Sequence, residues 1–182
     1  MNYEIKKFTI TKYQDIKKIY LNCFDKENRF SIMILLVNII FKRANMYMLL
    51  IKNEVVAFIY LINDNSQKFI LYLAVKEKYR NKGIGTYLLK WYLSNNKDNE
   101  IYLNIDEINE KYDDCIIRKK RLDFYIRNNF YNTNYLSVNG CSIGHILSNK
   151  QKFNVEKYKL FDKKISRWFL CKNDEIKKLC NK

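Results

Sequence analysis

Apolar residues recur along the chain at two spacings, one typical of helices and the other typical of strands. Within residues 13–24 the apolar positions Ile16, Ile19, Tyr20 and Cys23 are three or four residues apart, which predicts an amphipathic helix. Similar spacing, or an unbroken apolar run, predicts further helices over residues 30–45, 83–94, 113–128 and 155–169.

Shorter apolar runs bounded by turn residues predict the strands of a sheet. Asn53-Glu54 separates two such runs, and Asn139-Gly140 separates another two, so each pair of runs is expected to form a hairpin. Helices alternate with strands, and hairpins lie on both sides of a strand–helix–strand unit, so we expect a mixed α/β sheet. The predicted strands are residues 4–10, 47–52, 55–62, 68–75, 101–105, 131–138 and 142–148.

The most apolar segment is residues 30–41, FSIMILLVNIIF. It is too short to cross a bilayer, which takes about 20 residues, so we expect a buried helix or a helix that lines a substrate cleft, and no membrane partner. The first residues, MNYEIKKFTI, lack the apolar core of a signal peptide, which favours a cytoplasmic protein. In the helix predicted over residues 113–128, the expected inward positions are Ile116, Ile117, Leu122, Tyr125 and Ile126.

Composition bounds the class of protein. With 182 residues, 48% of them hydrophobic, the chain is long and apolar enough for one folded domain, and disorder is excluded. We expect a domain of residues 1–150 with a C-terminal helical extension, residues 151–182, that either packs on the domain or forms a homodimer contact. The net charge of +15 suggests an anionic partner, but lysines outnumber arginines 27 to 7 and are spread along the chain. Binding of nucleic acid is therefore the least favoured interpretation.

Cysteine and histidine usage points away from a metal site. The five cysteines are an odd number without a CxxC pair, and His145 is the single histidine, so no zinc ligand set at the usual spacing can be drawn. We expect no metal and reduced thiols, and we interpret His145 as structural.

The segment that carries chemistry is residues 71–93, LYLAVKEKYRNKGIGTYLLKWYL. Two of the chain's four glycines, Gly83 and Gly85, lie where a predicted strand leads into a predicted helix. A helix N-terminus has unpaired N–H groups and the positive end of the helix dipole, and glycine lets a phosphate approach the backbone. Four cations alternate along the preceding loop, Lys76, Lys78, Arg80 and Lys82. The residues alone predict a phosphorylated ligand at residues 80–86.

This segment resembles the acetyl-CoA signature of the GNAT N-acetyltransferases. The signature is Arg80-Asn81-Lys82-Gly83-Ile84-Gly85, preceded by Leu73-Ala74-Val75 and followed by Leu88-Leu89. The patterns of a Walker phosphate loop and of a dinucleotide fingerprint are absent. A second family motif is matched by Phe124-Tyr125 and Phe130, with Asn129 in place of a glycine; Asn tolerates the left-handed backbone of a helix C-cap. The resemblance covers about residues 1–150 and implies a GNAT fold, a largely antiparallel mixed sheet flanked by helices.

The resemblance also implies an activity, the transfer of an acetyl group from acetyl-CoA to a primary amine of a small molecule or protein by direct attack. It implies that Leu73, Ala74 and Val75 bind the pantetheine arm and that Tyr125 is the general acid toward the leaving thiolate. The cofactor-binding residues that it implies in the loop are Arg80, Asn81, Lys82, Gly83, Ile84, Gly85 and Thr86.

Five acidic residues are concentrated in residues 106–114, which by the resemblance border the acceptor site. Asp106 or Glu107 is a candidate for the general base or for a group that orients it; alternatively the acids form a solvated loop and cap the next helix. The basic residues that follow, Arg118, Lys119, Lys120 and Arg121, either meet the 3′-phosphate of CoA or pair with Asp114 and nearby acids, and pairing is the favoured interpretation. Two other functions stay open: an acyl-CoA-binding sensor of the same fold without turnover, and the nucleic-acid binder.

Overall fold

The computed structural model describes residues 3–64, 66–139, 142–172 and 174–179. The helices are α1 (Tyr13–Cys23), α2 (Ile32–Ile40), α3 (Ile84–Ser94), α4 (Cys115–Ile126) and α5 (Val155–Phe169), with 3-10 turns at Ile10–Lys12, Lys26–Asn28 and Glu77–Tyr79. The strands are β1 (Glu4–Lys7), β2 (Ala44–Ile51), β3 (Glu54–Asp64), β4 (Gln67–Val75), β5 (Glu100–Asp106), β6 (Tyr131–Asn139), β7 (Ser142–Ser148) and β8 (Glu175–Lys178).

These strands hydrogen-bond in the order β1-β2-β3-β4-β5-β7-β6-β8. The pair β4–β5 is parallel, whereas β1–β2, β2–β3, β5–β7, β6–β7 and β6–β8 are antiparallel. The predicted class, a mixed and largely antiparallel sheet with helices, is confirmed. The chain divides into two compact units, residues 1–65 with 70–98 and residues 66–69 with 99–182.

In the first unit, β2 and β3 form the predicted hairpin, with its turn one residue earlier than expected. Lys52 and Asn53 have φ angles of 47° and 64°, the left-handed pair that a tight two-residue hairpin turn requires. Glu54, predicted in the turn, is the first residue of β3 and pairs with Ile51.

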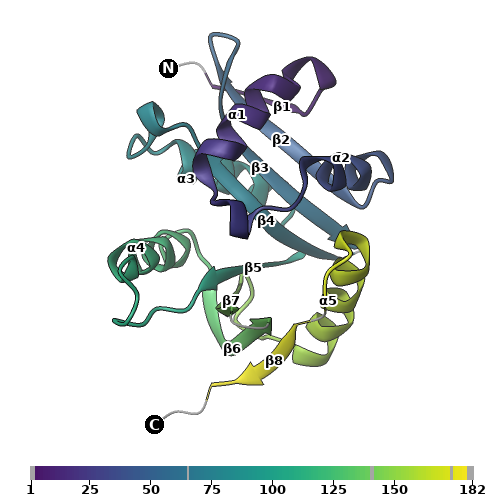
Figure 1. Cartoon of the computed structure of the whole chain (residues 1–182), viewed down its shortest axis with the longest axis vertical. Coiled ribbons are helices and arrows are strands. Elements are labelled where there is room, and N and C mark those ends of the chain that lie inside the picture. The colour runs from purple at the N-terminus through teal and green to yellow at the C-terminus, as the bar shows by residue number, and fades with distance from the viewer. Residues whose placement is uncertain (1–2, 65, 140–141, 173, 180–182) are drawn as a thin grey trace. The chain divides into compact units, whose positions relative to one another are not determined.

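Strand β3 is the centre of this unit, and its residues from Val55 to Ile62 are completely buried. Tyr20 of α1 contacts Phe58 on one face of the sheet, with ring centroids 6.5 Å apart, and Trp91 of α3 contacts Tyr47 on the other, 5.1 Å apart. Figure 1 shows α1 and α2 in front of these strands and α3 behind them. Because both faces are covered, β3 is a continuous apolar run instead of an alternating one.

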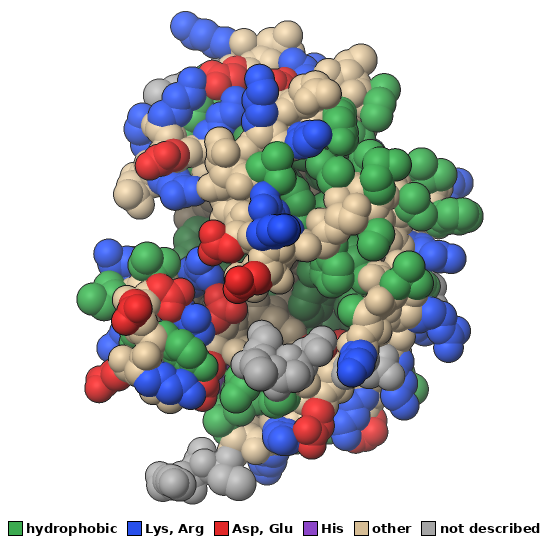
Figure 2. All heavy atoms as spheres, in the orientation of Figure 1, with side chains coloured by type: hydrophobic (Ala, Val, Ile, Leu, Met, Phe, Trp, Pro, Cys, Tyr) green, Lys and Arg blue, Asp and Glu red, His purple; other side chains and the backbone are tan. Residues whose placement is uncertain are grey.

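Helix α2 is shorter than the predicted helix 30–45, because the chain enters β2 at Ala44. It buries Leu35 and Asn38 against the sheet. The opposite face is solvent-exposed, so of the two expectations for this segment the buried helix is wrong, and the helix that lines a substrate cleft stays a prediction. Figure 2 shows hydrophobic side chains gathered over this face. These exposed residues are Met33, Val37, Ile40 and Phe41. In the described part of the chain, no helix is both long and apolar enough to span a membrane.

In the second unit, β6 and β7 pair in antiparallel register, as the predicted hairpin requires. Its expected turn at Gly140 lies outside the described residues. Helix α5 has the predicted bounds, Val155–Phe169. The segment after it adds a strand that the sequence pattern did not predict, because β8 has four residues and pairs along β6.

Helix α4 turns only part of its predicted face inward: Leu122 and Tyr125 are half-buried, but the three isoleucines are not. Ile116, Ile117 and Ile126 are 71%, 55% and 45% exposed. The Arg118 side chain, only 18% exposed, takes the inward position instead, since it binds Asp114 and the backbone oxygen of Glu107. The first turns of this helix therefore place a paired arginine inward, where the apolar spacing predicts isoleucines.

Candidate functional site

The loop between β4 and α3 has the left-handed backbone that its sequence requires. Asn81 and Gly83 have φ angles of 58° and 75°. Glycine adopts this conformation without strain and asparagine tolerates it, so the motif residues fit their places in the loop.

Helix α3 begins without a capping side chain. Gly83 is its N-cap, and the first intrahelical hydrogen bond runs from Tyr87 N to Gly83 O at 2.9 Å. The N–H groups of Ile84, Gly85 and Thr86 therefore have no acceptor within the helix. Ile84 is 1% exposed and anchors the first turn in the core. The result is a fixed set of N–H donors that can bind an anion.

The cations of the loop are partly neutralised by an acid from β3. Glu54 lies 3.0 Å from Lys76 and 2.9 Å from Lys78, and it accepts a hydrogen bond of 2.8 Å from the Tyr79 hydroxyl. The hydrogen bonds from Lys78 and Lys76, and then from Tyr79, lower the pKa of Glu54 to about 2. Lys82 donates to the backbone oxygen of Lys78. The local positive charge is thus smaller than the sequence suggests.

Arg80 is held against the end of β4. Its Nε donates to Val75 O at 3.3 Å and its Nη2 to Cys23 Sγ at 3.5 Å, while the Cys23 thiol donates to the same Val75 oxygen at 3.6 Å. A cavity of about 650 Å³ lies here, with Lys18 and Cys23 of α1 and Lys76 and Arg80 of the loop in its lining.

The segment Leu73–Val75 lies on an edge of the first unit's sheet, where Ile70–Val75 is the outer strand after β3. The ladder between β4 and β5 comprises three pairs and ends at Phe69 and Tyr102. Leu73, Ala74 and Val75 lie beyond that last pair. An edge strand presents backbone N–H and C=O groups that an extended ligand can pair with.

Tyr125 belongs to the second unit and lies on α4. Its ring contacts Phe124 and Phe130, with centroids 5.0 and 5.7 Å apart, and its hydroxyl makes no hydrogen bond to the residues that the structure describes. Burial raises the pKa of Tyr125 to about 12, against a smaller opposing effect of Arg121. The phenol is therefore protonated at neutral pH. Asn129 has φ 64°, as expected of a left-handed C-cap after this helix.

Asp106 and Glu107 lie at the end of β5, and both are engaged. Asp106 forms an ion pair of 2.7 Å with Arg121 of α4, four residues before Tyr125. Glu107 accepts a hydrogen bond of 3.2 Å from Tyr112 and lies 3.7 Å from Lys111. The structure thus brings the two candidate carboxylates and α4 together, although each acid has a cationic neighbour.

One contact near the site was predicted from the sequence, and several others have no sequence signal. The predicted pairing of Arg118 with Asp114 is confirmed at 2.6 Å. The guanidinium of Arg118 also lies 4.1 Å from the ring centroid of Tyr112, a residue to which no sequence pattern assigns a role. The contacts of Glu54 with Lys78 and of Cys23 with Arg80 were likewise missed, because they join residues 24 and 57 positions apart. Among the described residues, no group of three or more acids, cysteines or histidines could hold a metal ion.

A mixed sheet whose β4 leads through a glycine-bearing loop into a helix without a capping side chain defines an α/β protein with a set of free N–H donors at one helix start. Comparison with known families is more specific, since the model described as acetyltransferase (GNAT) domain matches residues 42–132, half of the chain. The chain therefore belongs to the GNAT acetyltransferase family.

Solved structures agree on the fold. A GNAT-family protein from Bacteroides thetaiotaomicron superposes with a TM-score of 0.68 at 17% identity, over 90% of this chain and 96% of that chain. The PaiA N-acetyltransferase of Thermoplasma acidophilum, solved in complex with coenzyme A, superposes with a TM-score of 0.58 at 19% identity, over 82% of this chain and 99% of that chain. The ribosomal-protein-S18-alanine N-acetyltransferase of Escherichia coli superposes with a TM-score of 0.59 at 12% identity, over 81% of this chain and 92% of that chain. No curated protein matches the sequence significantly.

Proposed function

We propose that this protein is an N-acetyltransferase that uses acetyl-CoA as acyl donor and a primary amine as acceptor. The observation that carries the proposal is the uncapped start of α3, where Gly83 is left-handed and the amides of Ile84, Gly85 and Thr86 have no intrahelical acceptor. Binding of a pyrophosphate would supply acceptors for these amides.

The remaining parts of acetyl-CoA match the same segment. The edge at Leu73–Val75, which lies beyond the last β4–β5 pair, suits the amide groups of the pantetheine arm, which can pair with the strand as an added strand does. Asn81 and Lys82 would complete the turn around the phosphates, and Arg80 would keep this turn against β4 through its bond to Val75 O. Solved GNAT structures with coenzyme A or acetyl-CoA bound support this choice of donor.

In the proposed reaction the amine nitrogen attacks the thioester carbonyl carbon, a C–N bond forms, and the C–S bond then breaks. Tyr125 would act as general acid and donate to the departing sulfur; a phenol is protonated at neutral pH, and burial raises the pKa of Tyr125 further. Donors placed where negative charge develops stabilise the transition state. The sulfur leaves as the neutral thiol of coenzyme A, and the proton that it gains is balanced by the one that the nitrogen loses as the amide forms.

The proton of the attacking ammonium needs an acceptor. Asp106 and Glu107 are the proposed groups, acting directly or through water. One observation favours the sensor alternative instead: both carboxylates are engaged, Asp106 by Arg121 and Glu107 by Tyr112 and Lys111. Substrate would have to bind with these contacts intact or replace them.

Two further features are proposed for the whole chain. We infer that residues 151–182 belong with the domain instead of forming a separate one, a view that the pairing of β8 with β6 supports. A cytoplasmic location is proposed because Cys23, Cys115 and Cys171 are free thiols, as is usual in a reducing compartment.

The test is to incubate the protein with acetyl-CoA and a panel of amines and to follow release of coenzyme A. Amine-dependent release supports the proposal. Tight binding of acetyl-CoA without release across the panel would favour the sensor. Absence of binding at millimolar acetyl-CoA would exclude both.

A further inference from the structure

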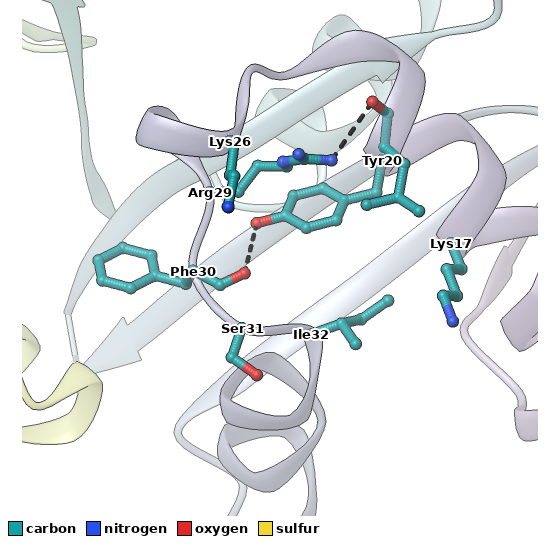
Figure 3. A pocket seen from close by; sticks show the side chains of 8 residues that line it. Lys17, Tyr20, Lys26, Arg29, Phe30, Ser31 and Ile32 are labelled. Atoms are coloured by element: carbon teal, nitrogen blue, oxygen red, sulfur yellow. Dashed lines mark hydrogen bonds between the residues drawn. The ribbon is translucent and has the colours of Figure 1, made fainter.

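A second pocket of the first unit lies between α1 and the start of α2 (Figure 3). Its volume is about 240 Å³, and its lining comes from the end of α1, the connecting loop and the first residues of α2. Three of its eight lining residues are cations, Lys17, Lys26 and Arg29, and none is an acid. Asp25 and Glu27 flank Lys26 in the loop but do not line the pocket. The side chains that line the pocket therefore carry a net positive charge.

These three cations are not neutralised by neighbouring carboxylates. In the described part of the chain, none of the three has an acid within ion-pair distance. Arg29 makes one long hydrogen bond, 3.4 Å from Nη1 to Leu21 O, and Lys17 lies 5.9 Å from the ring centroid of Tyr13. By contrast, Lys76 and Lys78 of the loop between β4 and α3 both form ion pairs with Glu54. A guanidinium with most of its donors unused is suited to a carboxylate or phosphate.

The backbone around this pocket is fixed by tyrosines from the core. The Tyr20 hydroxyl donates to Phe30 O at 3.0 Å, as Figure 3 shows. The Tyr72 hydroxyl donates to Asn28 O at 3.2 Å and accepts from Phe30 N at 3.1 Å. The loop that carries Lys26 and Arg29 is thus held in one geometry, as a binding pocket requires.

The same contacts place the pocket beside the proposed donor site. Tyr72 belongs to β4 and directly precedes Leu73, the first of the residues proposed to hold pantetheine. Its ring contacts Tyr20 of α1 at 5.0 Å between centroids. One side chain therefore connects the strand that would hold the acetyl donor with the loop that lines the pocket.

We propose that this pocket binds an anionic group of the acceptor, so that the preferred substrate is an amine that also carries a carboxylate or a phosphate. The inference rests on the proposed function and names its substrate class. Arg29 binds the anion through its unused N–H groups, and Lys26, Lys17 and the Ser31 hydroxyl complete the lining. The N-terminal end of the α2 dipole adds a weaker positive potential to that of the three cations.

The experiment compares matched amines. A series of ω-amino carboxylates of increasing length is tested against n-alkylamines of the same length, and O-phosphoethanolamine against ethanolamine, with kcat/KM measured from release of coenzyme A. We expect a preference of roughly 10- to 100-fold for the anionic member, as for one charge-assisted contact. The carboxylate and phosphate arms decide which anion fits better.

The variants are Arg29→Ala and Lys26→Ala, with Arg29→Gln as a second choice that keeps the side-chain bulk if the first does not fold. Each variant should lose most of the preference for the anionic amine, because KM for that amine rises, and its affinity for acetyl-CoA should be unchanged. The matched control is Arg167→Ala, which removes one exposed positive charge from α5 and should retain the preference. Titration of inorganic phosphate by calorimetry into wild type and Arg29→Ala gives a readout independent of turnover.

Two results would overturn the inference: equal kcat/KM within the matched pairs, or a preference that survives loss of Arg29. Release of coenzyme A in these cases would still support the proposed function. Conversely, phosphate binding that depends on Arg29, without release from any amine, would support the pocket and count against the proposed function.

Discussion

The φ angle of Gly83 explains why one of the chain's four glycines lies at the start of α3. Glycine is scarce in this chain, yet Gly83 stands where φ is 75° and the backbone turns into α3. Gly144 has a different reason, because a Cβ there would lie 3.0 Å from the backbone oxygen of Ile105. The first position could be assigned from the motif, but the second could not, since it depends on the approach of β5 to β7.

Replacing Gly83 by alanine tests the loop conformation. A Cβ at this position meets no atom within 4 Å, so the cost comes from the left-handed backbone alone. We expect Gly83→Ala to lower the free energy of unfolding by about 1 kcal/mol, measured by urea denaturation. Gly83→Asn is the control and should cost less. Equal stability of all three proteins would contradict a left-handed loop.

Tyr125 is the residue whose role is most open to direct test. Tyr125→Phe removes the proposed donor to the leaving sulfur and keeps the ring that contacts Phe130. We expect kcat to fall by roughly 100-fold with little change in the affinity for acetyl-CoA, measured by steady-state kinetics and calorimetry. If affinity is lost instead, Tyr125 has a structural role.

At the level of elements, the strands and helices that line the proposed site were predictable to within a few residues. The rotation of α4 was not, because Arg118 forms an inward contact with the backbone oxygen of Glu107, which follows β5 and lies 11 residues earlier in the chain. Strand β8 was missed for another reason: four residues with lysine on either side of an isoleucine carry no strand pattern by themselves. Only the neighbouring β6 makes this segment a strand.

The packing of α5 toward β8 includes a buried acid with a consequence for stability. Asp162 is 7% exposed and accepts a hydrogen bond of 3.2 Å from Asp174 N. Burial, and then the charge of Asp174, raises the pKa of Asp162 from 3.8 to about 7. The folded protein keeps a proton there that the unfolded chain releases, so stability falls as pH rises from about 4 to about 7 and is constant above.

Asp162→Asn should remove this pH dependence. The amide oxygen can still accept from Asp174 N, and no charge is buried, so we expect a gain at neutral pH of up to about 4 kcal/mol in the free energy of unfolding. Urea denaturation between pH 4 and 8 measures it, with Asp123→Asn on the exposed face of α4 as control. A variant with the slope of the wild type would show that Asp162 is not the group responsible.

For the whole molecule, the net charge of +15 says less than its distribution. Screening limits a charge to neighbours within about 8 Å at physiological salt. Glu54 already neutralises part of the positive charge of the loop between β4 and α3. Distant lysines therefore add little to local binding.

The affinity for acetyl-CoA should consequently depend on salt, but only mildly. We expect Kd to rise several-fold between low and high NaCl, since exposed cations near the loop are screened; calorimetry at several salt concentrations measures it. Dephospho-CoA, with one phosphate fewer, should show a shallower dependence than coenzyme A. A Kd that does not change with salt would mean that the loop amides bind the phosphates without help from the cations.

The sequence by itself determined the alternation of strands and helices, the glycine-bearing loop before α3 and the family to which the chain belongs. These are properties of short segments, where spacing, backbone freedom and a motif act locally. Only the tertiary structure decided that Glu54 pairs Lys76 and Lys78, that Arg118 turns inward, and that Arg29 lines a pocket beside Tyr72. The contacts of Glu54 join residues 22 and 24 positions apart, and all of these contacts depend on burial and geometry that no local pattern contains.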